Sequence, residues 1–280
     1  MSEEQNKVVK KQAPIGVFDS GVGGLTVVRE IIRQLPNENI IYFGDTARVP
    51  YGSKSPNSVI HFSKQIARFL ITKEVKAIVI ACNTASALAL EELQKQFELP
   101  IIGVVIPGAK VAVEATRNGE IGIVGTDATI RSGVYTEIIR SINPKISVHE
   151  KACPLFVPLV EEGFREHDVT GEIINYYLAA MKDSDVDTMI LGCTHYPLLR
   201  SRIMKYLGDK IQIVNPAYET AMDLKAILRG MELENDELTK EQIKYEFYVS
   251  DVDTGRFREF AQSLLSIDEI MTKTINIEEY

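Results

Sequence analysis

Residues 77–86 read Ala-Ile-Val-Ile-Ala-Cys-Asn-Thr-Ala-Ser, and residues 188–197 read Thr-Met-Ile-Leu-Gly-Cys-Thr-His-Tyr-Pro. Each stretch is a short apolar run that ends in a cysteine, Cys82 or Cys193, and continues into small polar residues. An apolar run with little alternation is typical of a strand covered on both faces of a parallel sheet. The two stretches therefore predict two buried strands, each followed by a thiol.

These two stretches belong to a longer alternation of Val- and Ile-rich runs with amphipathic segments. Strands are expected at 15–18, 40–43, 77–81, 101–105, 121–124, 147–151, 188–191, 212–214 and 245–249. Helices are expected at 26–34, 58–73, 86–97, 107–117, 132–141, 169–182, 197–206, 220–229 and 256–265. Such an alternation predicts an α/β fold with largely parallel sheets.

The chain also contains an internal repeat. Residues 15–20, Ile-Gly-Val-Phe-Asp-Ser, align with residues 121–126, Ile-Gly-Ile-Val-Gly-Thr, and a cysteine-bearing stretch follows each at a similar distance. The repeat predicts two similar α/β domains related by pseudo-symmetry. Because ligands bind beyond the carboxyl ends of strands in open parallel sheets, we expect the active site in the cleft between these domains, with a thiol on each side.

Domain boundaries follow from the same alignment. We expect the first domain to comprise residues 14–106 and 216–280 and to carry Cys82, and the second to comprise residues 107–215 and to carry Cys193. Ile-Pro-Gly at 106–108 is the expected crossover between them, because proline and glycine favour a turn, and Asn-Pro at 215–216 is the expected return.

Composition limits the classes of partner and the compartment. The 280 residues include 45% hydrophobic ones, enough for a large core, and the net charge is −8. This acidic balance, without a basic stripe, argues against nucleic acid and anionic membranes as partners. No apolar run is long enough to span a membrane, and residues 1–12 do not resemble a secretory signal, so we expect a cytoplasmic protein. The three cysteines are dispersed, so we expect free thiols and no metal site.

The residues after each cysteine are candidates for binding a carboxylate. Asn83 and Thr84 open a predicted helix, and the first N–H groups of a helix attract anions. Taken alone, Cys82 could equally be a buried apolar residue, and its neighbours simple helix caps. The second copy around Cys193 favours chemistry. His195, two residues further on, could orient a ligand or transfer a proton, although a lone histidine is more often structural.

A glycine-rich segment at 16–26 raises the question of phosphate binding. Val22 stands where a phosphate-binding loop requires lysine, and the glycine pattern of dinucleotide-binding loops is not met either. Phosphate is therefore not the expected ligand. Asp19 and Ser20 remain as candidates at a strand end, with helix capping as the structural alternative.

Two further segments carry polar candidates. Residues 44–52 form a loop with Tyr51 and Gly52 near its end, although Pro-Tyr-Gly is also compatible with an ordinary turn. Residues 153–163 contain the third thiol, Cys153, expected to be structural, and two adjacent acids, Glu161 and Glu162. Glu161 ends an apolar stretch and could point into the cleft, whereas solvated surface acids are the simpler interpretation of the pair.

Together these segments resemble the glutamate racemase family. The matching motifs are Val-Phe-Asp-Ser-Gly-Val-Gly-Gly-Leu-Thr-Val at 17–27, Gly-Asp-Thr-Ala-Arg-Val-Pro-Tyr-Gly at 44–52, Ala-Cys-Asn-Thr-Ala-Ser at 81–86 and Gly-Cys-Thr-His-Tyr-Pro at 192–197. The resemblance runs from about residue 14 to beyond residue 260. The aspartate branch of the superfamily typically has a Gly-Gly-Met-Gly turn where this chain has Asp-Ser-Gly at 19–21, so the glutamate branch is the closer match.

This resemblance implies an enzyme that converts L-glutamate to D-glutamate without pyridoxal phosphate or metal. It implies that Cys82 and Cys193 exchange protons with opposite faces of the α-carbon, assisted by Asp19, Glu161 and His195. Glu162 remains an alternative to Glu161. The residues implied to hold the substrate are Asp19, Ser20, Tyr51, Gly52, Asn83, Thr84, Thr194 and His195. The resemblance further implies supply of D-glutamate for peptidoglycan in a bacterial cytoplasm, and a homodimer is an expectation from the resemblance alone.

Two alternatives stay open at this point. The substrate could be aspartate or another small acidic amino acid, which a comparison of exchange rates would separate from glutamate. The chain could instead be a two-domain amino-acid-binding protein that binds a carboxylate without chemistry and leaves the α-hydrogen in place. For the enzyme, helix N-termini next to both cysteines are expected to favour the thiolate form.

Overall fold

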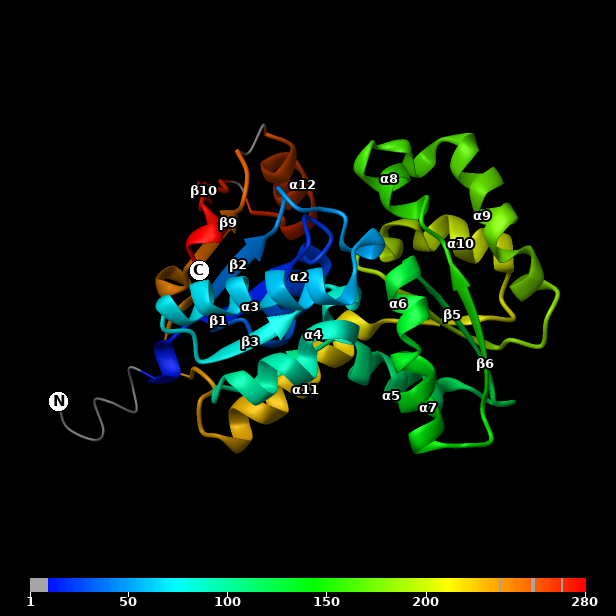
Figure 1. Ribbon diagram of the computed structural model, residues 1–280, viewed down its shortest axis with the longest axis horizontal. Coiled ribbons are helices and arrows are strands. Elements are labelled where there is room, and N and C mark those ends of the chain that lie inside the picture. Colours follow the sequence, from blue (N-terminus) through cyan, green and yellow to red (C-terminus); the bar gives the residue numbers. More distant parts are fainter. Residues whose placement is uncertain (1–9, 237, 253–254, 268) are drawn as a thin grey trace.

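The computed structural model describes residues 10–236, 238–252, 255–267 and 269–280, and it contains two parallel sheets (Figure 1). The first sheet has the order β10-β9-β2-β1-β3-β4, and the second has the order β6-β5-β7-β8. The first consists of β1 (Ile15–Asp19), β2 (Ile40–Gly44), β3 (Ala77–Ile80), β4 (Ile101–Gly103), β9 (Tyr245–Val249) and β10 (Thr272–Thr274). The second consists of β5 (Glu120–Gly125), β6 (Ser147–Ala152), β7 (Thr188–Gly192) and β8 (Gln212–Val214). The predicted α/β class with two parallel sheets is confirmed.

Helices connect the strands and cover the sheets (Figure 1). They are α2 (Leu25–Gln34), α3 (Pro56–Thr72), α4 (Asn83–Gln96), α5 (Val105–Ala115), α6 (Asp127–Ser132), α7 (Val134–Ile142), α8 (Phe156–Glu161), α9 (Asp168–Lys182), α10 (Arg200–Leu207), α11 (Pro216–Gly230) and α12 (Arg256–Leu265). Short 3₁₀ turns that matter below are η1 (Tyr51–Ser53), η3 (Tyr196–Leu199) and η5 (Ile277–Glu279). Within the described residues, no helix is both long and apolar enough to cross a membrane.

The repeat in the sequence corresponds to a repeat in topology. Strands β2-β1-β3-β4 of the first sheet have the same order as β6-β5-β7-β8 of the second. The aligned segments 15–20 and 121–126 begin at β1 and within β5, which are equivalent strands in this scheme. Cys82 follows β3 and Cys193 follows β7, so the two thiols also occupy equivalent positions. The strands of the two sheets lie within the two predicted domain ranges, and the exact boundaries stay a prediction.

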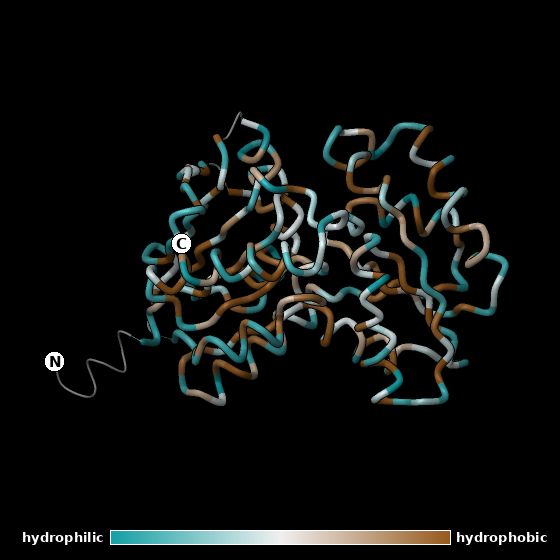
Figure 2. Tube along the Cα trace, in the orientation of Figure 1, coloured by the Kyte–Doolittle hydropathy of each residue, from teal (hydrophilic) through white to brown (hydrophobic). Residues whose placement is uncertain are grey.

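The core lies on both faces of the sheets, as continuous apolar strands require. Every residue of β1, β2, β3 and β7 is buried. Figure 2 shows hydrophobic residues concentrated along the interior strands and hydrophilic ones along outer loops and helix faces. Full burial of a Val, Leu, Ile or Phe side chain contributes roughly 1.5–3 kcal/mol, so these strands fix the framework that carries the loops.

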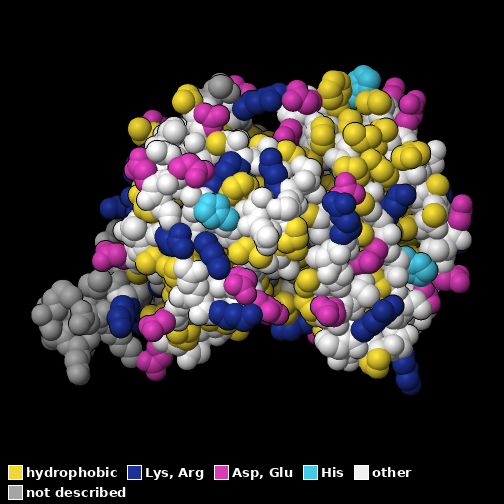
Figure 3. Space-filling model, in the orientation of Figure 1, with side chains coloured by type: hydrophobic (Ala, Val, Ile, Leu, Met, Phe, Trp, Pro, Cys, Tyr) yellow, Lys and Arg dark blue, Asp and Glu magenta, His cyan; other side chains and the backbone are white. Residues whose placement is uncertain are grey.

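The surface over α8 and α9 differs from the rest of the visible face in its side chains. In Figure 3, basic and acidic side chains are interspersed over most of the visible face, while hydrophobic side chains gather over α8 and α9. Leu155, Phe164 and Tyr176 are the large exposed hydrophobic residues of that region.

Two local predictions were wrong. The turn expected at 106–108 lies inside α5, where Pro107 occupies the first turn and its missing N–H is not required. A continuous helix at 197–206 is replaced by η3 followed by α10. The helix expected at 132–141 is present as α7, which begins just after Gly133, whose φ of 68° is left-handed. Strand β10 and helices α6 and α8 had no counterpart in the prediction.

Candidate active site

The two repeated thiols line one small cavity between the sheets. Its volume is about 20 Å³, and its lining consists of Ser20, Val49, Pro50, Tyr51, Gly52, Cys82, Asn83, Thr84, Thr126, Val157, Cys193, Thr194 and His195. Of the predicted site residues, only Asp19 and Glu161 do not line the cavity, and both lie behind it in contact with residues that do. The fold therefore brings together residues from positions 20 to 195 of the chain.

Cys82 lies at the N-terminus of α4. Its sulfur accepts a hydrogen bond from the backbone N–H of Ala85 at 3.5 Å, and its thiol donates to the Ser20 hydroxyl at 3.8 Å. Burial, with a smaller contribution from the neighbouring Asp19 carboxylate, raises the pKa of Cys82 to about 12, against the effect of the Ala85 N–H. The N–H at the helix N-terminus does favour the thiolate, as expected, but burial outweighs this one contact.

Cys193 has different neighbours. It is followed by the turn η3, not directly by an α-helix, and its sulfur lies 3.9 Å from His195 Nδ1. The other ring nitrogen, His195 Nε2, lies 2.9 Å from Glu161 Oε1. Burial opposes a charge on this ring, but the contacts with Cys193 and Glu161 outweigh it and raise the pKa of His195 to about 10. An imidazolium therefore lies beside Cys193 at neutral pH.

Asp19 lies at the end of β1, fully buried behind the cavity. Its carboxylate accepts hydrogen bonds from the Gly21 N–H at 3.0 Å and from the Thr194 hydroxyl at 3.3 Å. Burial raises the pKa of Asp19, although the nearby His195 acts in the opposite direction. Asp19 thus connects the surroundings of Cys82 with the segment that follows Cys193.

The adjacent acids Glu161 and Glu162 face different partners. Glu161 contacts His195, as described above, whereas Glu162 Oε2 accepts a hydrogen bond from Arg256 at 2.9 Å across the cleft. Both members of the Glu162–Arg256 pair are exposed. Glu161 is therefore the acid that reaches the site, which the sequence alone left open.

Comparison with known proteins identifies the family. Residues 15–223 match the Asp/Glu/hydantoin racemase family. The chain belongs to this family. The glutamate racemase of Geobacter metallireducens is 51% identical over 244 residues, which are 87% of this chain and 90% of that protein. The glutamate racemase of Bacillus cereus is 44% identical over 90% of this chain and 93% of its own length.

Solved structures of glutamate racemases are similar in fold to this chain. Glutamate racemase isoform RacE1 from Bacillus anthracis has a TM-score of 0.90 at 40% identity, covering 95% of this chain and 98% of that one. Glutamate racemase from Francisella tularensis in complex with D-glutamate has a TM-score of 0.89 at 38% identity, covering 96% and 100%. An aspartate racemase homologue from Pyrococcus horikoshii, at 13% identity and a TM-score of 0.54 over 77% of this chain and 99% of that one, shares the fold alone.

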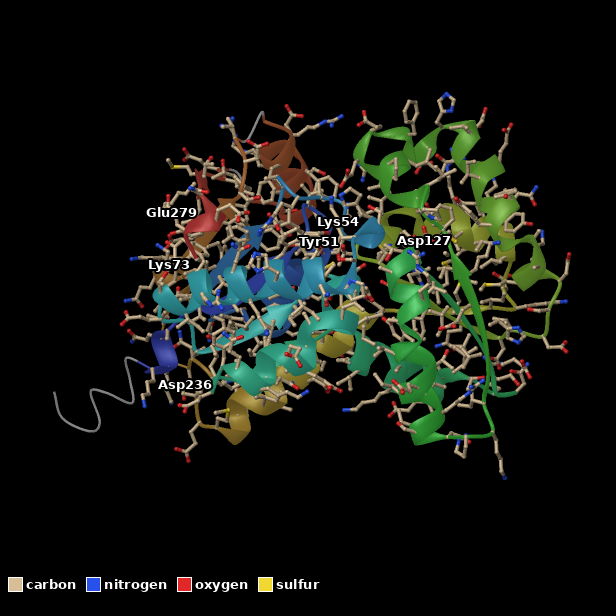
Figure 4. The ribbon with its side chains drawn as sticks, in the orientation of Figure 1. Tyr51, Lys54, Lys73, Asp127, Asp236 and Glu279 are labelled. Carbon is tan, nitrogen blue, oxygen red and sulfur yellow. The ribbon has the colours of Figure 1, made fainter. Side chains whose placement is uncertain are left out.

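The loop at 45–52 belongs to the half of the molecule that contains the first sheet. It brings that half into contact with α6. A Cβ added to Gly52 would lie 2.6 Å from the Cβ of Thr126, so no larger residue fits there without movement. The Tyr51 hydroxyl donates a hydrogen bond to the carboxylate of Asp45. Figure 4 shows Tyr51 on this loop and Lys54 just after it, with Asp127 on the facing helix. The loop thus forms one wall of the cavity and part of the contact between the two halves.

Thr126 is a cavity residue that was not predicted. Its hydroxyl lies 2.9 Å from the Thr84 hydroxyl, which joins the two halves next to Cys82. The side-chain oxygen of Asn83 accepts a hydrogen bond from Tyr135 across the same junction, at 2.7 Å. The internal repeat could have identified Thr126, because the alignment pairs it with Ser20, which was predicted as a site residue.

Cys153 is fully buried, and burial raises its pKa to about 12. All three cysteines are free. Among the described residues, no group of three or more His, Cys, Asp or Glu side chains is arranged to hold a metal ion.

Proposed function

We propose that this chain is a glutamate racemase that interconverts L-glutamate and D-glutamate by proton transfer at the α-carbon. One observation carries the proposal: Cys82 and Cys193, from equivalent positions of the repeat, line one small cavity with groups suited to a carboxylate. The relatives that are 51% and 44% identical are named glutamate racemases, and one structural neighbour is described in complex with D-glutamate.

Proton transfer would begin from two thiols in different states. Cys82, whose pKa is raised by burial, is suited to donate a proton, and Cys193, next to the imidazolium of His195, is suited to accept one. In one direction the Cys193 sulfur forms an S–H bond with the α-proton, and the C–H electron pair moves toward the carboxylate. Cys82 then transfers its proton to the opposite face of the α-carbon. The reverse reaction uses each sulfur in the opposite role.

The developing charge needs more than a base. The first N–H groups of α4, at Asn83 and Thr84, lie beside Cys82 and are suited to the substrate carboxylate as charge moves onto it. A positioned base contributes roughly 10²–10⁴-fold and a preorganised donor roughly 10²–10³-fold to a rate. Both are required together, because no single contribution reaches the acceleration of at least about 10⁶ that enzymes usually show.

Binding of substrate would require the two halves to separate. A cavity of about 20 Å³ holds roughly one water molecule, far less than glutamate needs. In our proposal the molecule opens to admit glutamate and closes around it. Closure would exclude water from the charged intermediate and strengthen its contacts with the protein.

The biological role in our proposal is the supply of D-glutamate for peptidoglycan in a bacterial cytoplasm. The named relatives come from bacteria, which is consistent with this role. Aspartate remains the alternative substrate. A homodimer stays a prediction, which sedimentation of the purified protein would test.

The test is exchange and inversion in deuterium oxide, with each enantiomer of glutamate and of aspartate. The wild type should invert glutamate and introduce deuterium at the α-carbon, with aspartate much slower. Cys82→Ala and Cys193→Ala should each lower the rate of inversion by at least about 10²-fold, the loss of one positioned base. Cys153→Ala is the matched control and should keep inversion. Inversion at the wild-type rate in either of the first two variants would refute the two-thiol mechanism.

A further inference from the structure

The C-terminal segment 272–280 lies beyond residues 15–223, which match the family, so the match assigns it no role. We propose that this segment positions the loop at 45–52 and thereby supports binding of the substrate by Tyr51 and Gly52. Glu278 and Arg48 are the positioning residues. The inference depends on the proposed function for the identity of the substrate, but the contacts on which it rests do not.

The segment is firmly attached to the first sheet and to α3. Strand β10 pairs in parallel with β9, and Ile277 is buried in the core. The main-chain oxygen of Tyr280 accepts a hydrogen bond from Arg68 at 2.9 Å, and its ring meets that of Phe69 edge-on at 5.3 Å. Figure 4 shows Glu279 at this end of the chain, above Lys73, which follows α3. The end of the chain is therefore an ordered part of the fold.

Glu278 connects this segment to the loop through Arg48. Arg48 Nη1 donates to Glu278 Oε1 at 3.1 Å and to Gln65 Oε1 at 2.5 Å. The amide of Gln65 in turn donates to the other oxygen of Glu278 at 3.2 Å, which closes a triangle of three side chains. The guanidinium group also lies over the ring of Phe62, 4.1 Å from its centre. Arg48 is therefore held from several directions.

Arg48 also contacts the loop that forms one wall of the cavity. Its Nε donates to Asp45 Oδ2 at 2.8 Å, and the same carboxylate accepts from the Tyr51 hydroxyl and, at Oδ1, from Ser250 at 2.7 Å. Asp45 is fully buried, and a buried carboxylate requires both a cation and hydrogen-bond donors. Arg48 is the cation within reach. The connected series Glu278, Arg48, Asp45 and Tyr51 runs from the end of the chain to the substrate cavity.

The expected consequence is a change in binding, with the reacting groups intact. Tyr51 and Gly52 line the cavity, and no contact of Glu278 reaches either thiol. Loss of uniform binding raises KM and leaves kcat unchanged. Because Glu278 is largely exposed, its contact with Arg48 is partly screened, and removal should raise the KM for glutamate about three- to five-fold.

The test compares two neighbouring glutamates. Glu278→Ala should raise KM as stated, with kcat and the melting temperature close to wild type. Glu278→Gln should recover part of the loss, because an amide oxygen still accepts from Arg48. Glu279→Ala is the matched control, since the Glu279 carboxylate accepts from Asn276 in the same turn at 3.0 Å. An unchanged KM in Glu278→Ala, or a parallel fall of kcat and melting temperature, would overturn the proposal.

Hydrogen exchange provides a readout that does not depend on activity. Amides of residues 45–54 should exchange about three- to five-fold faster in Glu278→Ala than in wild type, and at the wild-type rate in Glu279→Ala. Equal exchange in all three proteins would overturn the positioning role. If the wild type leaves the α-hydrogen of glutamate in place, the proposed function fails, and this exchange measurement still decides the role of the C-terminal segment.

Discussion

Cys82 and Cys193 occupy equivalent positions in the repeat, but the charges around them differ. Cys82 has the buried Asp19 carboxylate nearby, while Cys193 has the imidazolium of His195 at 3.9 Å. The pKa of Cys82 rises to about 12 as a result of burial and of Asp19. The fold thus surrounds two sulfurs of the same type with neighbours of opposite charge.

This difference predicts selective alkylation. With iodoacetamide at about pH 8 and limiting reagent, Cys82 and Cys153 should react slowly, because burial raises the pKa of both thiols to about 12, and Cys193, beside the imidazolium of His195, should be modified first. Peptide mass spectrometry would give the order of modification. His195→Gln should reduce this preference, and modification of Cys82 first in the wild type would contradict the assignment of charges.

The His195–Glu161 contact predicts a dependence of stability on pH. The pKa of His195 is raised from 6.5 to about 10 in the folded protein, so the charged contact stabilises fully below about pH 6.5 and loses its effect as the pH rises through about 10. The melting-temperature difference between wild type and Glu161→Ala should therefore shrink from neutral pH to about pH 10. Glu162→Ala, which removes an exposed pair, should differ little from wild type throughout. A constant difference for Glu161→Ala would argue against a charged His195.

At the scale of elements, the approach of η1 to α6 depends on one glycine. A Cβ at Gly52 would lie 2.6 Å from Thr126 Cβ, with no flexible atom to give way. Gly52→Ala should therefore move the loop from α6 and lower kcat/KM by roughly 10²-fold, the typical effect of misplacing a binding group by about 1 Å. Gly230→Ala is the control, since nothing lies within 4 Å of a Cβ at that position. Full activity of Gly52→Ala would mean that the two elements need not meet during turnover.

The elements that could be predicted from the sequence are those with a strong local pattern. Strands β1, β3 and β7 are continuous apolar runs, and the repeat identified which of them carry the thiols. Helix α8 was missed because Pro158 interrupts its six residues, and β10 because its three residues are polar and lie at a sheet edge. Glu161 and Glu162 could not be separated, since only the orientation of α8 decides which one meets His195.

At the scale of the whole molecule, a buried ion pair joins segments that are distant in the sequence and lie around the first sheet. Lys76 Nζ lies 2.5 Å from Glu38 Oε2, and both side chains are at most 2% exposed. The ammonium group also donates to the main-chain oxygens of Lys11 and Leu233. The pair therefore connects the chain before β1, the start of β3 and the segment after α11.

Removal of one partner from this pair should be costly. Lys76→Met leaves Glu38 as an uncompensated buried charge and should lower the free energy of unfolding by about 3–5 kcal/mol, measured by denaturant titration. The control Lys95→Met removes an exposed pair with Glu91 and should change it by less than about 1 kcal/mol. Equal effects of the two substitutions would mean that the buried pair does not hold these segments together.

Contacts between the two halves could not be predicted from the sequence, because they depend on how distant segments are folded against each other. Thr84 and Thr126 are 42 positions apart, and their hydroxyls meet only because α4 and α6 face each other. Composition and periodicity identified which residues are polar at strand ends. The distance between the strand ends of the first sheet and those of the second depends on how the two sheets are oriented. The small size of the cavity follows from that distance.

The small volume of the cavity has a consequence for isotopic labelling. In the proposed mechanism, a proton taken from the α-carbon would stay on the receiving sulfur until the halves separate, because the cavity has room for about one water molecule. During a single closure in deuterium oxide, the product should gain its deuteron from the opposite sulfur, while any substrate that reverts should regain its original proton. Early label should therefore appear in the product, and the remaining substrate should gain label only when labelled product returns through the reverse reaction. Label in the substrate before product accumulates would mean that solvent reaches the receiving sulfur during a closure.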